Sequence, residues 1–372
     1  MTSDITLLIP TFNNRHHYLT RILVYYRDLN AGFKIIIADS GPDPFAEAGN
    51  YSFLEYLHTP GSAYTNKMYR AINKITTPYT VMCADDDFIT LNGINKCMEF
   101  LNHHSDYSSA QGHLIAFTVP GELKIIPWMF QIVGLDINDN KPTERILHFF
   151  KHHIYLHYSV HRTKNLLDTF SLSKDFSDTF AGGSIEYFLD IISIINGKHK
   201  VVPVFYGAQE LAEISGRNSI TNLAKLRGME NYIGEYNLFI KKISDHIAKH
   251  ENIQEEKAAE FIADFFLNNP FFQSKEYLPS HITNPLSGNE FKHLKKTIDK
   301  IKGVATLKNI YSKSVHYLVL KSAERKKKKK IKEQTKLTRT FPGFPFYDNE
   351  AKAEWKLIEQ NILSHRNSKA ST

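Results

Sequence analysis

Short apolar runs alternate with amphipathic segments in the first part of the chain. Ile5 to Ile9 is a strand-like run that ends at Pro10, and the apolar positions after Arg15 repeat at helical spacing. The same alternation continues and predicts strands at 5–9, 34–38, 53–58 and 79–84, with helices at 18–26, 65–75 and 93–102. Repeated strand–helix alternation predicts an α/β fold with a mostly parallel sheet flanked by helices.

The second part of the chain carries strand-like runs at 111–117, 154–162 and 201–206, and a helical stretch at 183–196. From about residue 220 onward the strand signal disappears. Apolar stripes at helical spacing replace it, one running from Tyr236 to Ile247 and one through Phe261, Phe265 and Phe266. We therefore expect two halves of one α/β domain at 1–115 and 116–220, a helical extension at 221–320, and a basic and aromatic tail at 321–372.

Polar residues follow three of the predicted strands at their carboxyl ends. Pro10 and Thr11 follow the first strand, Asp39 the second, and Asp85, Asp86 and Asp87 the fourth. Parallel sheets bind ligands in the crevice beyond the carboxyl ends of their strands. The pattern therefore predicts one site that these residues share.

The sequence also indicates in which cellular compartment this site works. The first residues form no basic segment followed by an apolar stretch, and no window approaches the roughly 20 apolar residues of a membrane-spanning helix. The two cysteines, Cys83 and Cys97, are the usage typical of a reducing compartment and have no metal-binding spacing. We expect a cytoplasmic protein whose two thiols are buried in the core.

The formal net charge of +7 comes from one segment. Between Lys321 and Arg339, ten Lys or Arg stand against two Glu, so the rest of the chain is close to neutral. A nucleic-acid-binding protein normally spreads basic residues and stacking aromatics over its fold. The charge is therefore weak support for nucleic acid as a partner.

The acidic cluster Asp85–Asp87 suits the binding of a divalent cation, Mn²⁺ or Mg²⁺. Hard cations take oxygen ligands and can neutralise the diphosphate that leaves during transfer from a nucleotide. Three adjacent carboxylates repel one another unless a cation or solvent compensates. The alternative is an exposed acidic turn that caps the following segment.

Other phosphate and metal motifs fit less well. Phe88-Ile89-Thr90 follows the cluster, whereas a calcium loop or an aspartyl-phosphate phosphatase needs other residues there. Neither a Walker loop nor a GxGxxG motif is present, which argues against a nucleoside triphosphatase and a dinucleotide-dependent dehydrogenase.

Four segments in order resemble the nucleotide-binding half of family 2 glycosyltransferases. They are Leu7-Leu-Ile-Pro-Thr-Phe-Asn-Asn-Arg15, Ile35-Ile-Ile-Ala-Asp39-Ser40, Asn66 to Ala71, and Tyr79 to Asp87. Gly182 to Pro203 is similar, more loosely, to a subgroup found in bacterial surface-polysaccharide loci. The resemblance implies a GT-A fold and a metal-dependent, inverting transfer of a sugar from a nucleotide sugar, typically UDP-linked, to a glycan or lipid-linked acceptor.

The resemblance also implies roles for single residues. Pro10 and Thr11 would line the base pocket, and Asp39 would accept a hydrogen bond from the base. Asn66 would lie near the ribose or diphosphate, Asp85 or Asp86 would reach the ribose or sugar, and Asp87, with Asp85, would bind the metal. Arg15 would approach the phosphates; its alternative is a solvated arginine in the first turn of a helix.

Inversion requires a base that deprotonates the acceptor hydroxyl. Glu186 stands where family 2 enzymes carry this acid, although Tyr187 replaces the second acid of the usual pair. Asp190, four residues on and on the same helical face, is the second candidate. Gln209-Glu210 replaces the basic pair that related sequences carry after the last strand, which leaves Arg217 as a positional substitute.

The tail combines an apolar helical stripe, the run Lys326–Lys330, and an aromatic segment from Phe341 to Tyr347. This combination suits docking on an anionic membrane surface, where each basic residue contributes about 1 kcal/mol. The alternative is a solvated helix end with an aromatic loop folded onto the body.

Two other functions compete with sugar transfer. A sugar nucleotidyltransferase needs a glycine-rich loop after the first strand, and Asn13-Asn14-Arg15 lacks one. A non-catalytic adaptor would use the transferase fold only to bind membrane or nucleic acid through the lysine run.

Overall fold

The computed structural model describes residues 2–13, 15–119, 123–126, 136–151, 155–211, 223, 230–269, 272, 346 and 348–370. One compact unit comprises Met1–Asn269 with Gly343–Thr372, and a second comprises Pro270–Pro342. Apart from Phe272, the second unit lies outside the described residues.

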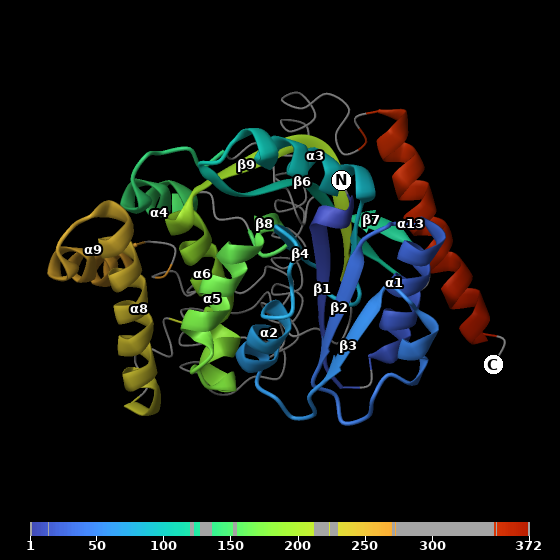
Figure 1. The fold of residues 1–372 in the computed structure, drawn as a ribbon, viewed down its shortest axis with the longest axis horizontal. Helices are drawn as coiled ribbons and strands as arrows, with labels where there is room; N and C mark the ends of the chain where they lie inside the picture. The colour runs from blue at the N-terminus through green and yellow to red at the C-terminus, as the bar shows by residue number, and fades with distance from the viewer. Residues whose placement is uncertain are drawn as a thin grey trace, which may run out of the picture. The chain divides into compact units, whose positions relative to one another are not determined.

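In the described residues, nine strands form a single sheet (Figure 1). The strands are β1 Ile5–Thr11, β2 Lys34–Asp39, β3 Leu54–His58, β4 Tyr79–Met82, β5 Phe88–Ile89, β6 Tyr107–Thr118, β7 Lys124–Ile126, β8 Val160–Arg162 and β9 Lys198–Glu210. Their order is β3-β2-β1-β4-β8-β6-β9-β5, and β7 pairs with β6. The first four strands are parallel, as is the β6–β9 pair. β8 runs antiparallel to both its neighbours, and β5 and β7 run antiparallel to their partners.

Helices cover both faces of this sheet, which confirms the predicted α/β class. The helices are α1 His16–Asp28, α2 Tyr64–Ile72, α3 Leu91–His103, α4 Pro142–Lys151, α5 Thr163–Ser173, α6 Asp178–Asn196, α8 Ile233–Glu251, α9 Glu255–Asn268 and α13 Asn349–Ala370, with short 3₁₀ helices at Thr2–Asp4, Ala46–Asn50 and Glu230–Tyr232. Helices α1 and α13 lie on one side of β1–β3, and α2, α5 and α6 lie on the other (Figure 1). None of the helices within the described residues is both long enough and apolar enough to cross a membrane.

The predicted elements of the first half are all present, with ends that shift by a few residues. In the second half the prediction of a strand at 154–162 is wrong for residues 155–159, because within the described part of this range only Val160–Arg162 pairs with the sheet. The preceding residues form a turn in which Ser159 N donates to Leu156 O at 2.9 Å. The helices α4 and α5 and the short strands β5 and β7 were not predicted.

Helices α8 and α9 lie within the predicted helical extension at 221–320, and most of its other residues lie outside the described residues. Phe239, Ile243 and Ile247 of the predicted stripe are fully buried. Phe239 is the centre of an aromatic cluster, with ring centroids 5.5 Å from Phe188 of α6 and 5.4 Å from Phe266 of α9. The apolar stripe of α8 therefore attaches the extension to α6.

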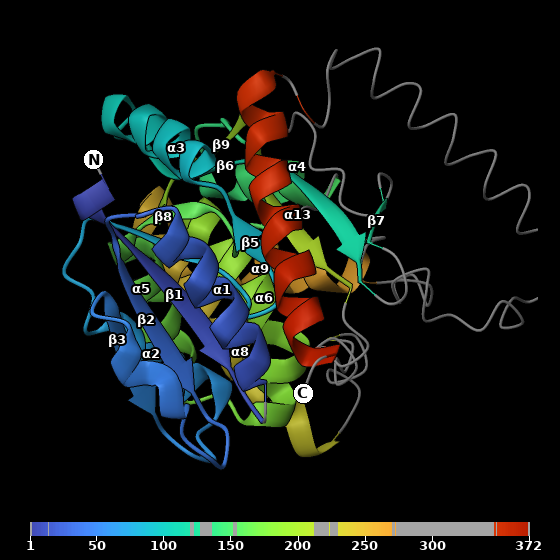
Figure 2. The ribbon, with the colours of Figure 1, turned by 90° about the vertical axis from the view of Figure 1, so that its right-hand side faces the viewer.

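Helix α13 packs beside α1 and completes the core on that side (Figure 2). Ala351, Ile358 and Ile362 are buried, and the Trp355 ring centroid lies 6.2 Å from that of Phe117 in β6. Glu354 accepts a hydrogen bond from Asn92 N at 3.0 Å. The last part of the predicted tail is thus a helix of the α/β unit.

Both cysteines are buried, as predicted. Burial raises the pKa of the Cys83 and Cys97 thiols, so neither forms a reactive thiolate readily.

Candidate functional site

The candidate site lies where the strand order of the sheet reverses. The chain runs from β1 outward through β2 to β3 and then returns to place β4 on the other side of β1. Such a point opens a crevice at the carboxyl ends of the strands. Here Thr11, the last residue of β1, donates its hydroxyl to Asp85 Oδ2 at 2.5 Å.

Arg15 covers the acidic cluster. Asn13 has φ +53, a left-handed conformation that asparagine tolerates better than most residues, and Arg15 N donates to Asn13 O at 2.9 Å. This tight turn follows β1 directly. The Arg15 Nη2 atom lies 2.7 Å from Asp85 Oδ1 and 2.7 Å from Asp86 Oδ2, so one nitrogen bridges two carboxylates. Arg15 is 7 % exposed, so the alternative of a solvated first-turn arginine is wrong.

Asp87 is held by two different segments of the second half. Its Oδ1 accepts from Glu210 N at 2.8 Å, and its Oδ2 accepts from the Tyr158 hydroxyl at 2.7 Å. Asp85, Asp86 and Asp87 are only 3 %, 6 % and 4 % exposed. The alternative of an exposed acidic turn is therefore wrong.

Arg21 and Glu210 belong to the same network, and neither was predicted as a site residue; Glu210 was named only as part of the pair that replaces a basic pair. Arg21 Nη1 donates to Glu210 Oε2 at 2.6 Å, and Arg21 Nη2 donates to Asp86 O at 2.7 Å. Arg21 lies three residues after Tyr18 and four before Tyr25, on a buried face of α1. A positively charged residue on the predicted apolar face of this helix could have identified Arg21 as a site residue. Glu210 was missed because the predicted strand ended at Tyr206, whereas β9 continues to Glu210.

The network has a formal negative excess. Asp85, Asp86, Asp87 and Glu210 provide four carboxylates, and Arg15 and Arg21 provide two guanidinium groups, which leaves a formal charge of −2. Burial raises the pKa of the Asp85 and Glu210 carboxyls, and their arginine partners oppose the rise. A single divalent cation would balance this excess.

The oxygens of the cluster already have protein partners. In the described part of the chain, no three acidic, histidine or cysteine side chains are arranged to hold one metal ion together. The position that bridges Asp85 and Asp86 is taken by Arg15 Nη2. The carboxylate donor set nonetheless fits a hard divalent cation in its chemistry, because such cations take oxygen ligands.

Asp39 lies at the end of β2 and is fully buried. Its Oδ1 accepts from Gly41 N at 2.7 Å, and its Oδ2 accepts from the Tyr56 hydroxyl at 2.6 Å. A Cβ atom on Gly41 would lie 3.0 Å from Asp39 Oδ1 and 3.0 Å from Asn13 O. Glycine therefore allows the turn after β2 to close over this carboxylate. Pro10 lies one residue before the end of β1, paired with Ala38 of β2.

Lys67 connects the ends of β1 and β2 and was also missed by the sequence analysis. Its Nζ donates to Thr11 O at 2.5 Å and to Ser40 Oγ at 2.9 Å. Burial lowers the pKa of Lys67 to about 8, and the charges of Asp39 and Asp85 oppose that shift. Asn66, the preceding residue of α2, is exposed. The structure thus brings Lys67 rather than Asn66 to the strand ends.

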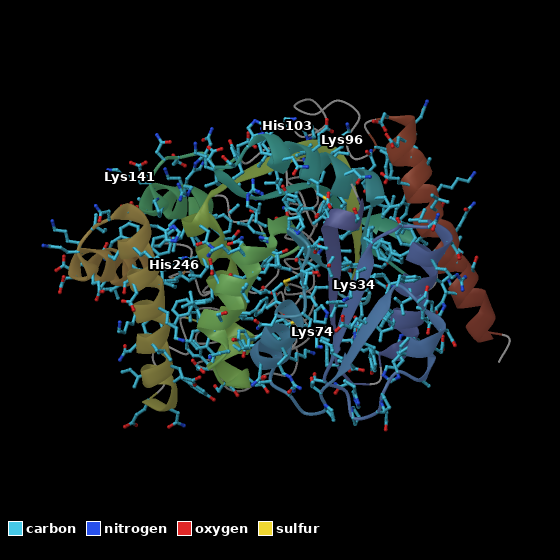
Figure 3. All side chains as sticks on the ribbon, viewed as in Figure 1. Lys34, Lys74, Lys96, His103, Lys141 and His246 are labelled. Carbon is cyan, nitrogen blue, oxygen red and sulfur yellow. The ribbon has the colours of Figure 1, made fainter. Side chains whose placement is uncertain are left out.

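A pocket of about 230 Å³ lies between α2 and the ends of β2 and β3. Three basic side chains line it, those of Lys67, Arg70 and Lys74. The Lys74 ammonium lies 3.3 Å from Glu55, which also pairs with Lys34 (Figure 3 labels both lysines).

The two candidate bases occupy different environments on α6. Glu186 is half-buried, and its charge, after burial itself, raises the pKa of Tyr64 at the start of α2. The Tyr64 ring centroid lies 5.8 Å from Lys67 Nζ. Asp190 is fully buried and accepts from Leu156 N at 3.0 Å. Leu156 lies two residues before Tyr158, whose hydroxyl donates to Asp87.

Three predicted features lie outside the described residues. They are Arg217, the run Lys326–Lys330, and the aromatic segment 341–347 except for Phe346. The ring centroid of Phe346 lies 5.4 Å from that of Phe205 in β9.

Comparison with known proteins gives matches in structure alone. No protein-family model matches the chain, and no curated protein matches it in sequence. The chain is similar to S. aureus TarS 1–349 in complex with UDP-GlcNAc, with 14 % identity over 71 % of this chain and 71 % of that chain and a TM-score of 0.47. For TarS 1–349 in complex with UDP, the identity is 14 % over 72 % of each chain, with a TM-score of 0.43. At TM-scores below 0.5, these likenesses establish neither a family nor an activity for this chain.

Proposed function

We propose that this chain is an inverting glycosyltransferase that moves a sugar from a UDP-linked donor to a glycan or lipid-linked acceptor in bacterial surface-polysaccharide synthesis. The observation that carries the proposal is the buried charge network at the reversal of strand order. There the ends of β1 and β4 meet, and Arg15 and Lys67 lie against Asp85–Asp87 and the end of β2. Buried charges are costly to maintain, so such a concentration is typical of a functional site.

The donor would lie over the strand ends. Asp39 keeps lone pairs beyond its bonds to Gly41 and Tyr56 and would accept a hydrogen bond from the base, beside Pro10 and Thr11. Lys67 and Arg15 are the buried cations nearest the strand ends and would attract the diphosphate. Asp85 or Asp86 would accept from the ribose or the sugar.

Negative charge develops on the departing diphosphate as its bond to the sugar breaks. A divalent cation, Mn²⁺ or Mg²⁺, held by Asp87 and Asp85, would act as a Lewis acid toward that charge. Glu186 would take the proton from the acceptor hydroxyl, because a half-buried carboxylate keeps access to a substrate. Asp190, buried against Leu156, would position Tyr158 and through it Asp87.

Membrane docking through Lys326–Lys330 stays a prediction, and so does the non-catalytic adaptor, because those residues lie outside the described part of the chain. The sugar nucleotidyltransferase remains disfavoured, since the turn at Asn13 carries Arg15 in place of a glycine-rich loop.

A donor screen tests the proposed function. Purified chain is incubated with UDP-, GDP- and CMP-linked sugars, with Mn²⁺ or with a chelator, and release of the nucleotide is measured. We expect release from a UDP-sugar that depends on the cation. Absence of release from every donor, together with absence of UDP binding, would contradict the assignment.

Lys67 gives the donor site a dependence on pH. Its pKa of about 8 in the free protein means that the ammonium is charged below that pH and neutral above it. We expect UDP affinity to fall by about tenfold between pH 7 and pH 9, as expected for the loss of one charge near a diphosphate. Calorimetric titration at several pH values measures this, and Lys67→Met is the control because it retains every other titrating group. An equal pH dependence in both proteins would rule Lys67 out as the cause.

A further inference from the structure

The Arg15 guanidinium occupies the oxygens of Asp85, one of the two residues proposed to hold the cation. Its Nη2 lies 2.7 Å from one oxygen of Asp85 and 2.7 Å from one oxygen of Asp86, and its Nε lies 3.0 Å from both Asp85 oxygens. A metal ion held by Asp85 would compete with Arg15 for the same oxygens.

Arg15 is held in place by aromatic rings as well as by charge. Its guanidinium carbon lies 4.5 Å from the Tyr18 ring centroid and 5.5 Å from that of Phe12. Cation–π contacts favour the charged form. A competing cation, or a new anion that attracts the guanidinium, would draw it away from these contacts.

We propose that Arg15 is an internal counter-ion of the acidic cluster and that a divalent cation binds there by displacing it. The inference rests on the proposed function for the identity of the anion that receives the displaced guanidinium, which is the diphosphate of the donor. The cation and the nucleotide then bind cooperatively. The cation takes the carboxylates from Arg15, and the diphosphate gives Arg15 a new partner.

The reciprocity of linked binding makes this measurable without turnover. Mn²⁺ binding to the full chain is followed by the loss of the free-ion paramagnetic resonance signal, with and without UDP. In the wild-type protein we expect weak Mn²⁺ binding that UDP strengthens. In Arg15→Gln we expect Mn²⁺ alone to bind about tenfold more tightly or better, because the competing charge has gone, and UDP to strengthen it less.

Arg27→Gln is the matched control. Arg27 pairs at 2.8 Å with Asp28 on an exposed part of α1, and both side chains are more than half exposed. Its Mn²⁺ affinity should equal that of the wild-type protein. Equal or weaker Mn²⁺ binding by Arg15→Gln than by wild type would overturn the proposal.

Loss of a buried cation can also destabilise the fold, so thermal unfolding provides a second readout. Mn²⁺ should raise the midpoint of Arg15→Gln by more than it raises that of wild type, because the ion replaces the missing charge. Equal shifts would again overturn the proposal. If Arg15→Gln gains Mn²⁺ affinity but UDP binds neither protein, the Arg15 proposal stands and the donor assignment fails. If UDP and Mn²⁺ bind both proteins alike, the donor assignment stands and the Arg15 proposal fails.

Discussion

Asp87→Asn is expected to lower cation-dependent release of UDP from the donor by about 100- to 1,000-fold, as for other removals of a group that stabilises developing charge. The substitution preserves shape. The asparagine oxygen can still accept from Glu210 N, and its amide can donate to the Tyr158 hydroxyl oxygen. What disappears is the negative charge that would bind the cation. Initial rates of UDP release and the thermal midpoint measure the two effects separately.

Tyr158→Phe is the matched control for Asp87→Asn. It removes the hydroxyl that donates to Asp87 but leaves the carboxylate charge, so a loss of about tenfold or less is expected. A fully active, cation-dependent Asp87→Asn enzyme would show that the cluster does not bind the catalytic metal.

Glu186→Gln is expected to lower kcat for transfer to the acceptor by about 100- to 10,000-fold, the range of general base catalysis. UDP affinity should stay unchanged, because the proposed base acts on the acceptor hydroxyl and not on the donor. Steady-state kinetics with acceptor and UDP titration without acceptor measure these two quantities.

Glu99→Gln provides the surface control for this change. Glu99 lies on α3 and pairs at 3.1 Å with Lys96, with both side chains about half exposed. Transfer at the wild-type rate by Glu186→Gln would show that the proton goes elsewhere, and Asp190→Asn would then be the next variant.

The first half of the site was predictable because its residues follow strands in the sequence. Thr11, Asp39 and Asp85 each come at or just after the end of an apolar run, and parallel strands bring those ends to one edge of the sheet. Local periodicity, together with the rule that parallel strands end at one edge of the sheet, is therefore enough to predict these three residues.

The partners of these residues were not predictable in the same way. Tyr158 and Glu210 reach Asp87 from segments 71 and 123 residues away in sequence, and no periodicity encodes such a contact. Lys67 was missed for a different reason. It follows Asn66 by one residue, and one step along a helix turns the side chain by about 100°. The resemblance pointed to the exposed side of α2, whereas the buried side carries the contact with Thr11.

Helix α13 is synthesised after all the other described elements, including those that it packs against. Its buried face meets α1 and the Phe117 side of the sheet, which are synthesised far earlier. At roughly 5–20 residues per second, the ribosome needs tens of seconds to travel from α1 to α13. We expect the apolar surface that Ile358 and Ile362 later cover to stay exposed throughout that interval.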